Sequence, residues 1–197
     1  MTVLSTSVPM MVMLGLLAGA AQAPAPAPAQ PLGPETFDAK VTLEAPPPAV
    51  GTVVVPVTIQ IDRYTPDHAR TTMTDALKYN GYPGFLRALR EAPPAGNIDI
   101  NGRKVTIRWA RETPDATGRQ LSFVTDQPIY FVGGALKNAK PKAGYEVGVI
   151  LLHLDKAGKG DGTIAAAARV KPLDVTGVQL DDYAEKPVKV TAAVRAK

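Results

Sequence analysis

Cysteine is absent from this chain of 197 residues. Its absence excludes disulfide bonds, thiol nucleophiles and thiolate metal ligands. A folded domain must therefore be held together by its hydrophobic core alone. The segment from residue 35 to residue 197 is long enough for this, because a domain of about 150 residues buries about two thirds of the surface that its unfolded chain exposes.

Residues for nucleophilic and metal chemistry are also scarce. The only histidines are His68 and His153, and Ser122 is the only serine after residue 30. Ser122 lies in an alternating strand pattern without the glycines of a nucleophile elbow, so a Ser-His-Asp triad is not predicted. The two histidines lie far apart in the sequence, one in a helical turn and one in a strand. We therefore expect neither a metal site nor a cofactor.

Charged residues are missing from the start of the chain, where Glu35 is the first. The 22 Lys and Arg and the 18 Asp and Glu residues give a formal net charge of +4. The basic residues are scattered, with no run longer than two, and the aromatic residues are not interleaved with them. The sequence thus lacks the basic stripe that is typical of nucleic-acid binding, and we expect no nucleic-acid partner.

The uncharged N-terminal segment has an apolar core at residues 10–17, followed by small residues up to residue 23. This arrangement is typical of a secretory signal peptide spanning residues 1–23. The core is shorter than the roughly 20 apolar residues that cross a bilayer, so no membrane span is expected after signal removal. Residues 24–34 alternate proline with small residues and predict an extended linker. We expect an exported protein, periplasmic or extracellular; a disordered Ala/Pro-rich start is the alternative.

Residues 35–197 are predicted to form one mainly β domain. Apolar residues recur at every second position in nine segments separated by turn residues, as half-buried strands require. Such a series indicates a single antiparallel β-barrel-like or sandwich domain, whereas a parallel α/β fold would need more helices. Asn101-Gly102 predicts a tight hairpin, and Pro56 places its strand at an edge or a bulge. The predicted strands are 37–44, 52–64, 98–100, 105–109, 121–125, 145–154, 163–170, 175–180 and 187–194.

One helical insertion is predicted at about residues 66–92. Thr65 has the hydroxyl of an N-cap, and Pro66 suits the first helical position. Asn80-Gly81 predicts a stop, after which a second helix begins near Pro83. The sequence therefore predicts a helical hairpin, which we expect to cover one end of the sheet as a lid.

Candidate binding residues cluster where the longest predicted strand meets the helix. Arg63 and Tyr64 bring a guanidinium and a phenol to this junction, and Trp109, Arg111 and Asp126 are further candidates. In the structural interpretation, which we favour, Arg63 ties the helix to Asp126 or Glu112, and Tyr64 packs with its hydroxyl at the surface.

Carboxylates offer an alternative chemistry. Asp126, Asp181 or Asp182 together with His153 would serve a carboxylate- or metal-assisted hydrolase. A glycosidase needs two acids facing each other across a gap, which spacing alone does not establish. Adjacent acids such as Asp181 and Asp182 point to opposite faces of a strand, so a solvated loop is the favoured interpretation.

Five short segments together resemble a group of small exported bacterial proteins of unknown function. The resemblance covers about residues 52–194 and brings no known catalytic residue. With the β architecture, it favours an exported, non-catalytic domain that binds a small apolar ligand or a partner protein of the cell envelope. The hydrolase and an envelope scaffold are the alternatives. The segments are residues 61–65, 109–114, 125–129, 154–160 and 183–188.

Overall fold

The predicted signal peptide and nearly all of the predicted linker lie outside the described part of the chain. The computed structural model describes residues 33–45, 48, 50–130, 142–173, 177–182 and 188–195. Within these ranges, the side chains of residues 173, 177–179, 181 and 182 are not described. All described residues belong to one unit, Pro31–Lys197.

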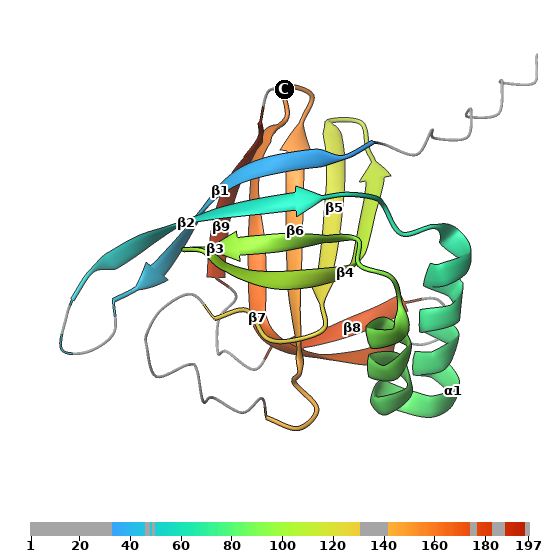
Figure 1. Ribbon diagram of the computed structural model, residues 1–197. Helices are drawn as coiled ribbons and strands as arrows, with labels where there is room; N and C mark the ends of the chain where they lie inside the picture. The colour runs from blue at the N-terminus through green and yellow to red at the C-terminus, as the bar shows by residue number, and fades with distance from the viewer. Residues whose placement is uncertain are drawn as a thin grey trace, which may run out of the picture. The chain divides into compact units, whose positions relative to one another are not determined.

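Nine strands and one helix follow one another in the described part of this unit, and each predicted strand has its counterpart (Figure 1). Neighbouring strands pair antiparallel in the order β6-β5-β4-β3-β2-β1-β9-β7, and β7 pairs in turn with β6. These eight strands therefore close into a barrel, and β8 extends it by pairing with β7. The prediction of a mainly β, barrel-like or sandwich domain with one helical insertion is confirmed, and of these two architectures the structure has the barrel. The elements are β1 (Glu35–Glu44), β2 (Thr52–Ile61), α1 (Asp67–Glu91), β3 (Gly96–Ile100), β4 (Arg103–Pro114), β5 (Gly118–Thr125), β6 (Val147–Asp155), β7 (Lys159–Leu173), β8 (Gly177–Asp182) and β9 (Val188–Val194).

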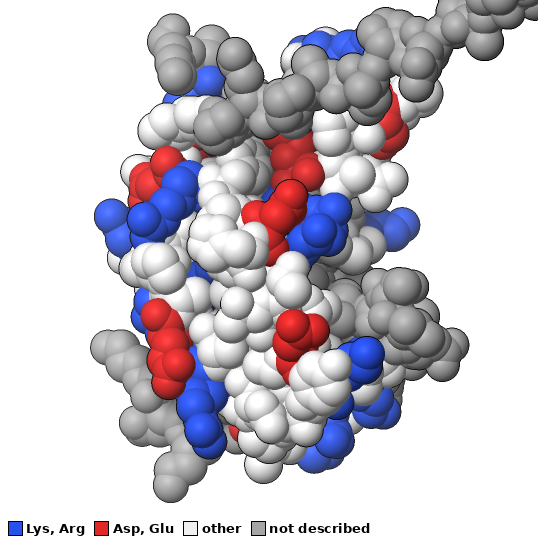
Figure 2. Space-filling view, turned by 90° about the vertical axis from the view of Figure 1, so that its right-hand side faces the viewer, with Lys and Arg blue, Asp and Glu red and all other residues white. Residues whose placement is uncertain are grey.

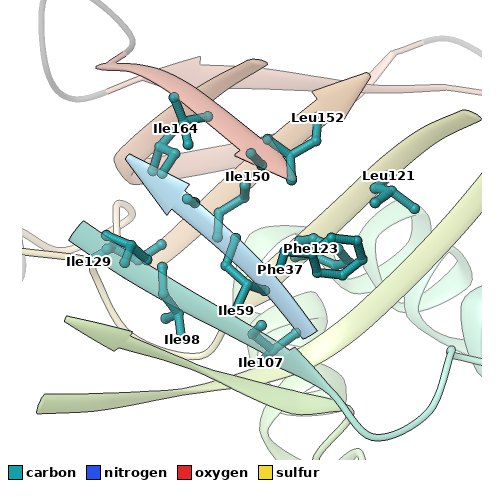
Figure 3. Close-up of a cluster of buried hydrophobic side chains, with 14 of the residues drawn as sticks. Phe37, Ile59, Ile98, Ile107, Leu121, Phe123, Ile129, Ile150, Leu152 and Ile164 are labelled. Atoms are coloured by element: carbon teal, nitrogen blue, oxygen red, sulfur yellow. The ribbon is translucent and has the colours of Figure 1, made fainter. Parts of the chain in front are cut away.

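The interior of the barrel is filled by apolar side chains. Alternate residues of each strand point inward, and most of them are isoleucine, valine, leucine or phenylalanine. Phe37 of β1 and Phe123 of β5 lie side by side in this interior, with ring centroids 6.0 Å apart (Figure 3). Eight strands enclose a space just wide enough for side chains to fill. The interior is therefore a packed core, and burial of this apolar surface stabilises the fold.

Two local predictions in the strands are confirmed. Asn101 and Gly102 both have positive φ, 52° and 80°, which is the geometry of the tight turn that joins β3 to β4. The Oδ1 of Asp99 accepts a hydrogen bond from the Gly102 amide at 2.8 Å. Pro56 pairs with Lys40 of β1, while the pairing of β2 with β3 begins only at Val57. Pro56 therefore lies on a free edge, where its missing N–H costs no hydrogen bond.

Helix α1 is a hairpin of two helical arms. Gly81 interrupts it with φ 65° and ψ −167°, a conformation open to glycine, and the two arms lie side by side (Figure 1). The prediction of Thr65 as the N-cap is wrong. The N-cap is Pro66, which has no side chain to donate or accept. Thr65 instead extends the sheet: its amide donates to the Ala110 carbonyl at 2.7 Å, and its hydroxyl accepts from the Ala110 amide at 2.9 Å.

The helix packs against the outside of the barrel wall, so the expectation of a lid over one end is also wrong. Its buried side chains, among them Leu77 and Phe85, contact Val149 of β6 and Val170 of β7 in a second apolar cluster. On β6 the neighbouring Ile150 belongs to the interior core. Because successive residues of a strand point to opposite faces, Val149 faces outward and α1 lies on the outer face.

Candidate functional site

A groove of about 370 Å³ lies between α1 and the outer barrel wall, and we call it the α1 groove. Its residues come from six elements, and eight of the twelve are apolar. The α1 groove is lined by Arg70, Thr74, Leu77, Phe85, Trp109, Arg111, Ser122, Val124, Val149, Leu151, Val170 and Leu180.

The floor of the α1 groove consists of two rows of side chains that run across β4, β5 and β6. In the first row Trp109 pairs with Val124, and Val124 pairs with Val149. This row packs with the helix in the second apolar cluster. The second row lies one step further along the strands. The floor thus continues from beneath α1 toward solvent.

The second row carries the polar residues of the floor. Arg111 pairs with Ser122, which pairs with Leu151. Leu151 is 42% exposed, unusually open for a leucine on this wall. This row therefore ends in a cation on β4 and in an exposed apolar side chain on β6, with Ser122 between them.

A β-bulge turns Trp109 toward the groove. The register between β4 and β5 shifts between Ile107 and Trp109. Ile107 and Ala110 both belong to the interior core, so the alternation is interrupted by one residue. Trp109 therefore points outward where an unbroken strand would direct it inward. This irregularity explains why alternation alone did not place Trp109.

Two arginines contribute positive charge to the α1 groove. Arg70 forms a loose ion pair with the largely exposed Asp67, its Nη2 lying 3.6 Å from Oδ1, and its Nε is buried without a hydrogen-bond partner. Arg111 has no hydrogen-bond or ion-pair partner among the described residues. Neither Asp nor Glu occurs among the described residues that line the groove. In its described lining, the groove therefore joins an apolar surface to two arginines and no carboxylate.

A different arrangement closes one end of the barrel interior, where four side chains form what we call the ionic cluster: Glu35, Tyr64, Glu112 and Arg119. Arg119 donates to Glu35 Oε1 and Oε2 and to Glu112 Oε2, each at 3.1 Å. The Tyr64 hydroxyl donates to Glu35 Oε2 at 2.6 Å. Burial, and then the hydrogen bond to the Glu35 carboxylate, raise the pKa of Tyr64 well above its usual range. The polar groups of this cluster satisfy one another, which is typical of a structural arrangement.

The structure distributes the five predicted binding residues over different places. Trp109 and Arg111 meet in the α1 groove, and Tyr64 lies in the ionic cluster. Arg63 is exposed and its Nε donates to the Pro94 carbonyl at 2.9 Å. The proposed tie from Arg63 to Asp126 or Glu112 is therefore wrong.

Asp126 has its own partner, Arg108. The Arg108 Nε donates to Asp126 Oδ2 at 2.7 Å, and its Nη1 donates to the Ala92 carbonyl at the end of α1 at 2.9 Å. Arg108 thus anchors the helix to the barrel. Asp126 serves this anchor and does not reach the groove.

The acids and the histidine of the hydrolase alternative do not converge where they are described. His153 pairs with Gln120, six residues before Asp126 along β5, which separates the two by roughly 20 Å. The side chains of Asp181 and Asp182 lie outside the description. Their backbones pair with Arg169 and Ala168 of β7.

His153 contacts the turn between β4 and β5, which the sequence analysis did not identify as a partner of this histidine. Its Nε2 lies 3.1 Å from both Thr117 Oγ1 and Asp115 Oδ2. In a catalytic triad the nucleophile and the acid contact different ring nitrogens, whereas here both contact the same one. Asp115 also accepts from the Thr117 and Gly118 amides, which identifies the contact as part of the turn between β4 and β5.

Other parts of the surface offer less than the α1 groove. A wider depression of about 720 Å³ on the far side of the barrel is lined by charged residues of both signs, among them Asp38, Lys40, Asp99 and Lys159. In the described residues, no three His, Asp or Glu side chains gather in a way that would hold a metal ion. Their one helix is not apolar enough to cross a membrane.

Comparison with known proteins adds no relative from which a site could be transferred. No family model, no curated protein and no solved structure matches this chain. The side chains of the groove and of the ionic cluster are therefore the basis for assigning a role.

Proposed function

We propose that this chain is an exported, non-catalytic β-barrel protein that binds a small apolar ligand in the α1 groove. The observation that supports binding is the apolar lining, in which Trp109 and Phe85 supply aromatic surface and Val124, Val149 and Leu151 supply aliphatic surface. Ligand sites are concave and mostly apolar, with a few polar groups that fix orientation. The α1 groove has this composition.

The size of the groove narrows the class of ligand. Ligand pockets range over roughly 300–1,000 Å³, so about 370 Å³ suits a small or slender molecule. The interior of the barrel is a less suitable place, because Phe37, Phe123 and Ile59 fill it with fully buried side chains. Helix α1 and the outer wall therefore form the binding surface, with the packed barrel as its rigid support.

We propose a non-catalytic function because of the residues that line the groove. Its described lining contains hydroxyls, those of Thr74 and Ser122, but neither a histidine nor a carboxylate that would act as their base. Outside the groove, the Glu35 and Glu112 carboxylates are both held by Arg119. Binding without chemical conversion is what this set of residues supports.

Export rests on the apolar core at residues 10–17 and the small residues up to residue 23. We expect the mature protein to begin at Pro24 or a few residues later. N-terminal sequencing of the protein secreted by an expressing bacterium tests this, and an intact Met1 would contradict it. This test is independent of the groove.

Binding is tested with an uncharged fluorescent apolar probe, N-phenyl-1-naphthylamine, titrated into the full chain. Trp109 is the only tryptophan and lies in the groove, so its emission reports on the bound probe directly. The variant Ser122→Phe places a ring in the floor and should weaken binding at least about tenfold, a loss of about 1.4 kcal/mol.

The matched control is Thr42→Phe, which adds a ring to an exposed position of β1 away from the groove. It should bind the probe as the parent chain does. Circular dichroism and urea melts establish that both variants are folded. Failure of the folded parent chain to bind any probe, or equal binding by Ser122→Phe, would contradict the proposed function.

A further inference from the structure

The α1 groove is not apolar throughout, because two guanidinium groups line it from opposite sides. Arg70 belongs to α1, which forms the roof, and Arg111 belongs to β4, which forms the floor. The apolar residues that line the same groove include Trp109, Val124 and Phe85. A molecule that fills the groove would therefore touch an apolar surface and two cations together.

Arg70 has hydrogen-bonding capacity left over. Its Nε is buried and donates to no described group. Its one ion pair, with Asp67, spans 3.6 Å, and the Asp67 side chain is 91% exposed, so solvent competes for that contact. A buried N–H without a partner is costly and favours a ligand that accepts from it.

Arg111, the second cation of the groove, has no counterion among the described residues. Its neighbours across the sheet are Ser122 and then Leu151, and neither carries charge. A guanidinium presents N–H groups in a planar fork that matches the two oxygens of a carboxylate. Covering Arg111 with an uncharged ligand would remove water from it without replacing the lost hydrogen bonds.

We propose that the ligand of the α1 groove is a single-chain amphiphile with a terminal carboxylate, of the fatty-acid type. This inference rests on the proposed function and adds the chemistry of the ligand. The acyl chain lies against Trp109, Val124 and Phe85, and the carboxylate accepts hydrogen bonds from Arg70 and Arg111. Charge complementarity identifies the head group, and the small volume of the groove favours one chain over two.

The experiment measures displacement of N-phenyl-1-naphthylamine from the full chain by three ligands of equal chain length. These are dodecanoate, 1-dodecanol and dodecylamine, at a pH at which the acid is ionised and the amine is protonated. The two ions are used below their critical micelle concentrations, and the alcohol below its solubility limit. Dodecanoate should bind at least about tenfold more tightly than 1-dodecanol. Dodecylamine should bind more weakly than either.

Three variants assign the preference to the groove. Arg70→Gln and Arg111→Gln should each lose most of the preference for dodecanoate over 1-dodecanol, measured as the ratio of the two affinities. The matched control is Arg87→Gln, which removes an exposed arginine of α1 that does not line the groove. It should keep the full preference.

The outcomes separate the two proposals. Equal affinity for the acid and the alcohol would overturn the anionic ligand while leaving apolar binding in place. A preference for dodecanoate that survives in both groove variants would show that these arginines do not bind the head group, and would also overturn this inference. If the folded parent chain binds neither the probe nor any of the three ligands, the proposed function falls and the inference with it.

Discussion

Arg111 and Arg119 lie on neighbouring strands but in opposite surroundings. Arg119 points toward the interior end of the barrel, is 17% exposed, and donates to both Glu35 and Glu112. Arg111 points outward into the α1 groove and has no partner among the described residues. One guanidinium is thus held by two carboxylates, and the other is available to a ligand as far as its described surroundings show. The difference separates a structural cation from a candidate binding cation.

The pleat of β4 produces this difference between adjacent residues. Arg111 and Glu112 follow each other in the sequence and point to opposite faces. Glu112 joins the ionic cluster at the barrel end, while Arg111 joins the groove. The same strand therefore supplies a stabilising carboxylate to one region and, to the other, a cation without a partner among the described residues. The surface is mixed in charge on the side shown in Figure 2, so the distinction rests on local contacts, not on a charged patch.

The largest effect is expected for Arg119→Leu. This change leaves the carboxylates of Glu35 and Glu112 close together without their shared cation, and their side chains are only 18% and 14% exposed. Removing one partner of a buried ion pair is strongly destabilising, and partial exposure places this case at the lower end, about 3 kcal/mol. Urea melts at neutral pH measure the free energy of unfolding.

Arg111→Leu is the matched comparison on the adjacent strand. Since Arg111 has no described partner, its loss should change the free energy of unfolding by no more than about 0.5 kcal/mol. Similar destabilisation by the two substitutions would remove the distinction between Arg119, as a structural cation, and Arg111, as a candidate binding cation. A large loss of stability in Arg111→Leu alone would make Arg111 the structural cation of the two.

A smaller effect is expected for Tyr64→Phe, which sharpens the description of the ionic cluster. The substitution removes the 2.6 Å hydrogen bond to Glu35 and keeps the ring. Hydrogen bonds to charged groups contribute about 1.5–3 kcal/mol, and we expect about 1.5 kcal/mol for this half-buried position. The control is Tyr79→Phe, because Tyr79 is 73% exposed and should contribute little.

The same variant has an expected signature at alkaline pH. Burial and the Glu35 carboxylate raise the pKa of Tyr64 in the folded protein. Above the ordinary tyrosine pKa of about 10, the unfolded chain releases this proton while the folded chain keeps it, so stability falls as the pH rises. Tyr64→Phe should make that decline shallower, and Tyr79→Phe should not. Urea melts below and above about pH 10 measure this decline in the free energy of unfolding. An equally steep decline with pH in the parent chain and in Tyr64→Phe would contradict the assignment.

Much of the barrel was predictable because its determinants are local. Alternation in residues 37–44 and 52–64 indicated β1 and β2, and Asn101-Gly102 fixed the β3–β4 hairpin through its positive φ angles. Gly81 marked the break in the helical hairpin. Each of these features depends on neighbours within a few residues, so a short stretch of sequence is enough to predict it.

The sites were less predictable because they depend on distant residues. Glu35 and Arg119 are 84 residues apart and meet only when β1 and β5 align at one end of the barrel. The bulge beside Trp109 turns this side chain to the face on which α1 packs, and alternation does not reveal it. Trp109 and Arg111 were candidates from sequence, but Arg70 was not, because its role depends on where the helix lies.

The smallest effect is expected for His153→Ala. This variant tests whether an exposed ion-pair contact contributes to stability as an enclosed one does. His153 contacts Asp115 as closely as Arg119 contacts Glu35, but its side chain is 44% exposed. Hydrogen bonds from the Thr117 side chain and backbone lower the pKa of Asp115 to about 2, and the charge of His153 is the smallest contribution. Any stability from this ionised turn is therefore present above the ordinary Asp pKa of about 3.9 and is lost as the pH falls below it.

His153→Ala should leave that acid transition and the neutral urea melt unchanged within error, whereas Thr117→Ala should move the Asp115 pKa upward in a carboxyl NMR titration. If His153→Ala alone returned the Asp115 pKa to its ordinary value, an exposed contact would matter as much as the enclosed contacts of Arg119, and the comparison would fail.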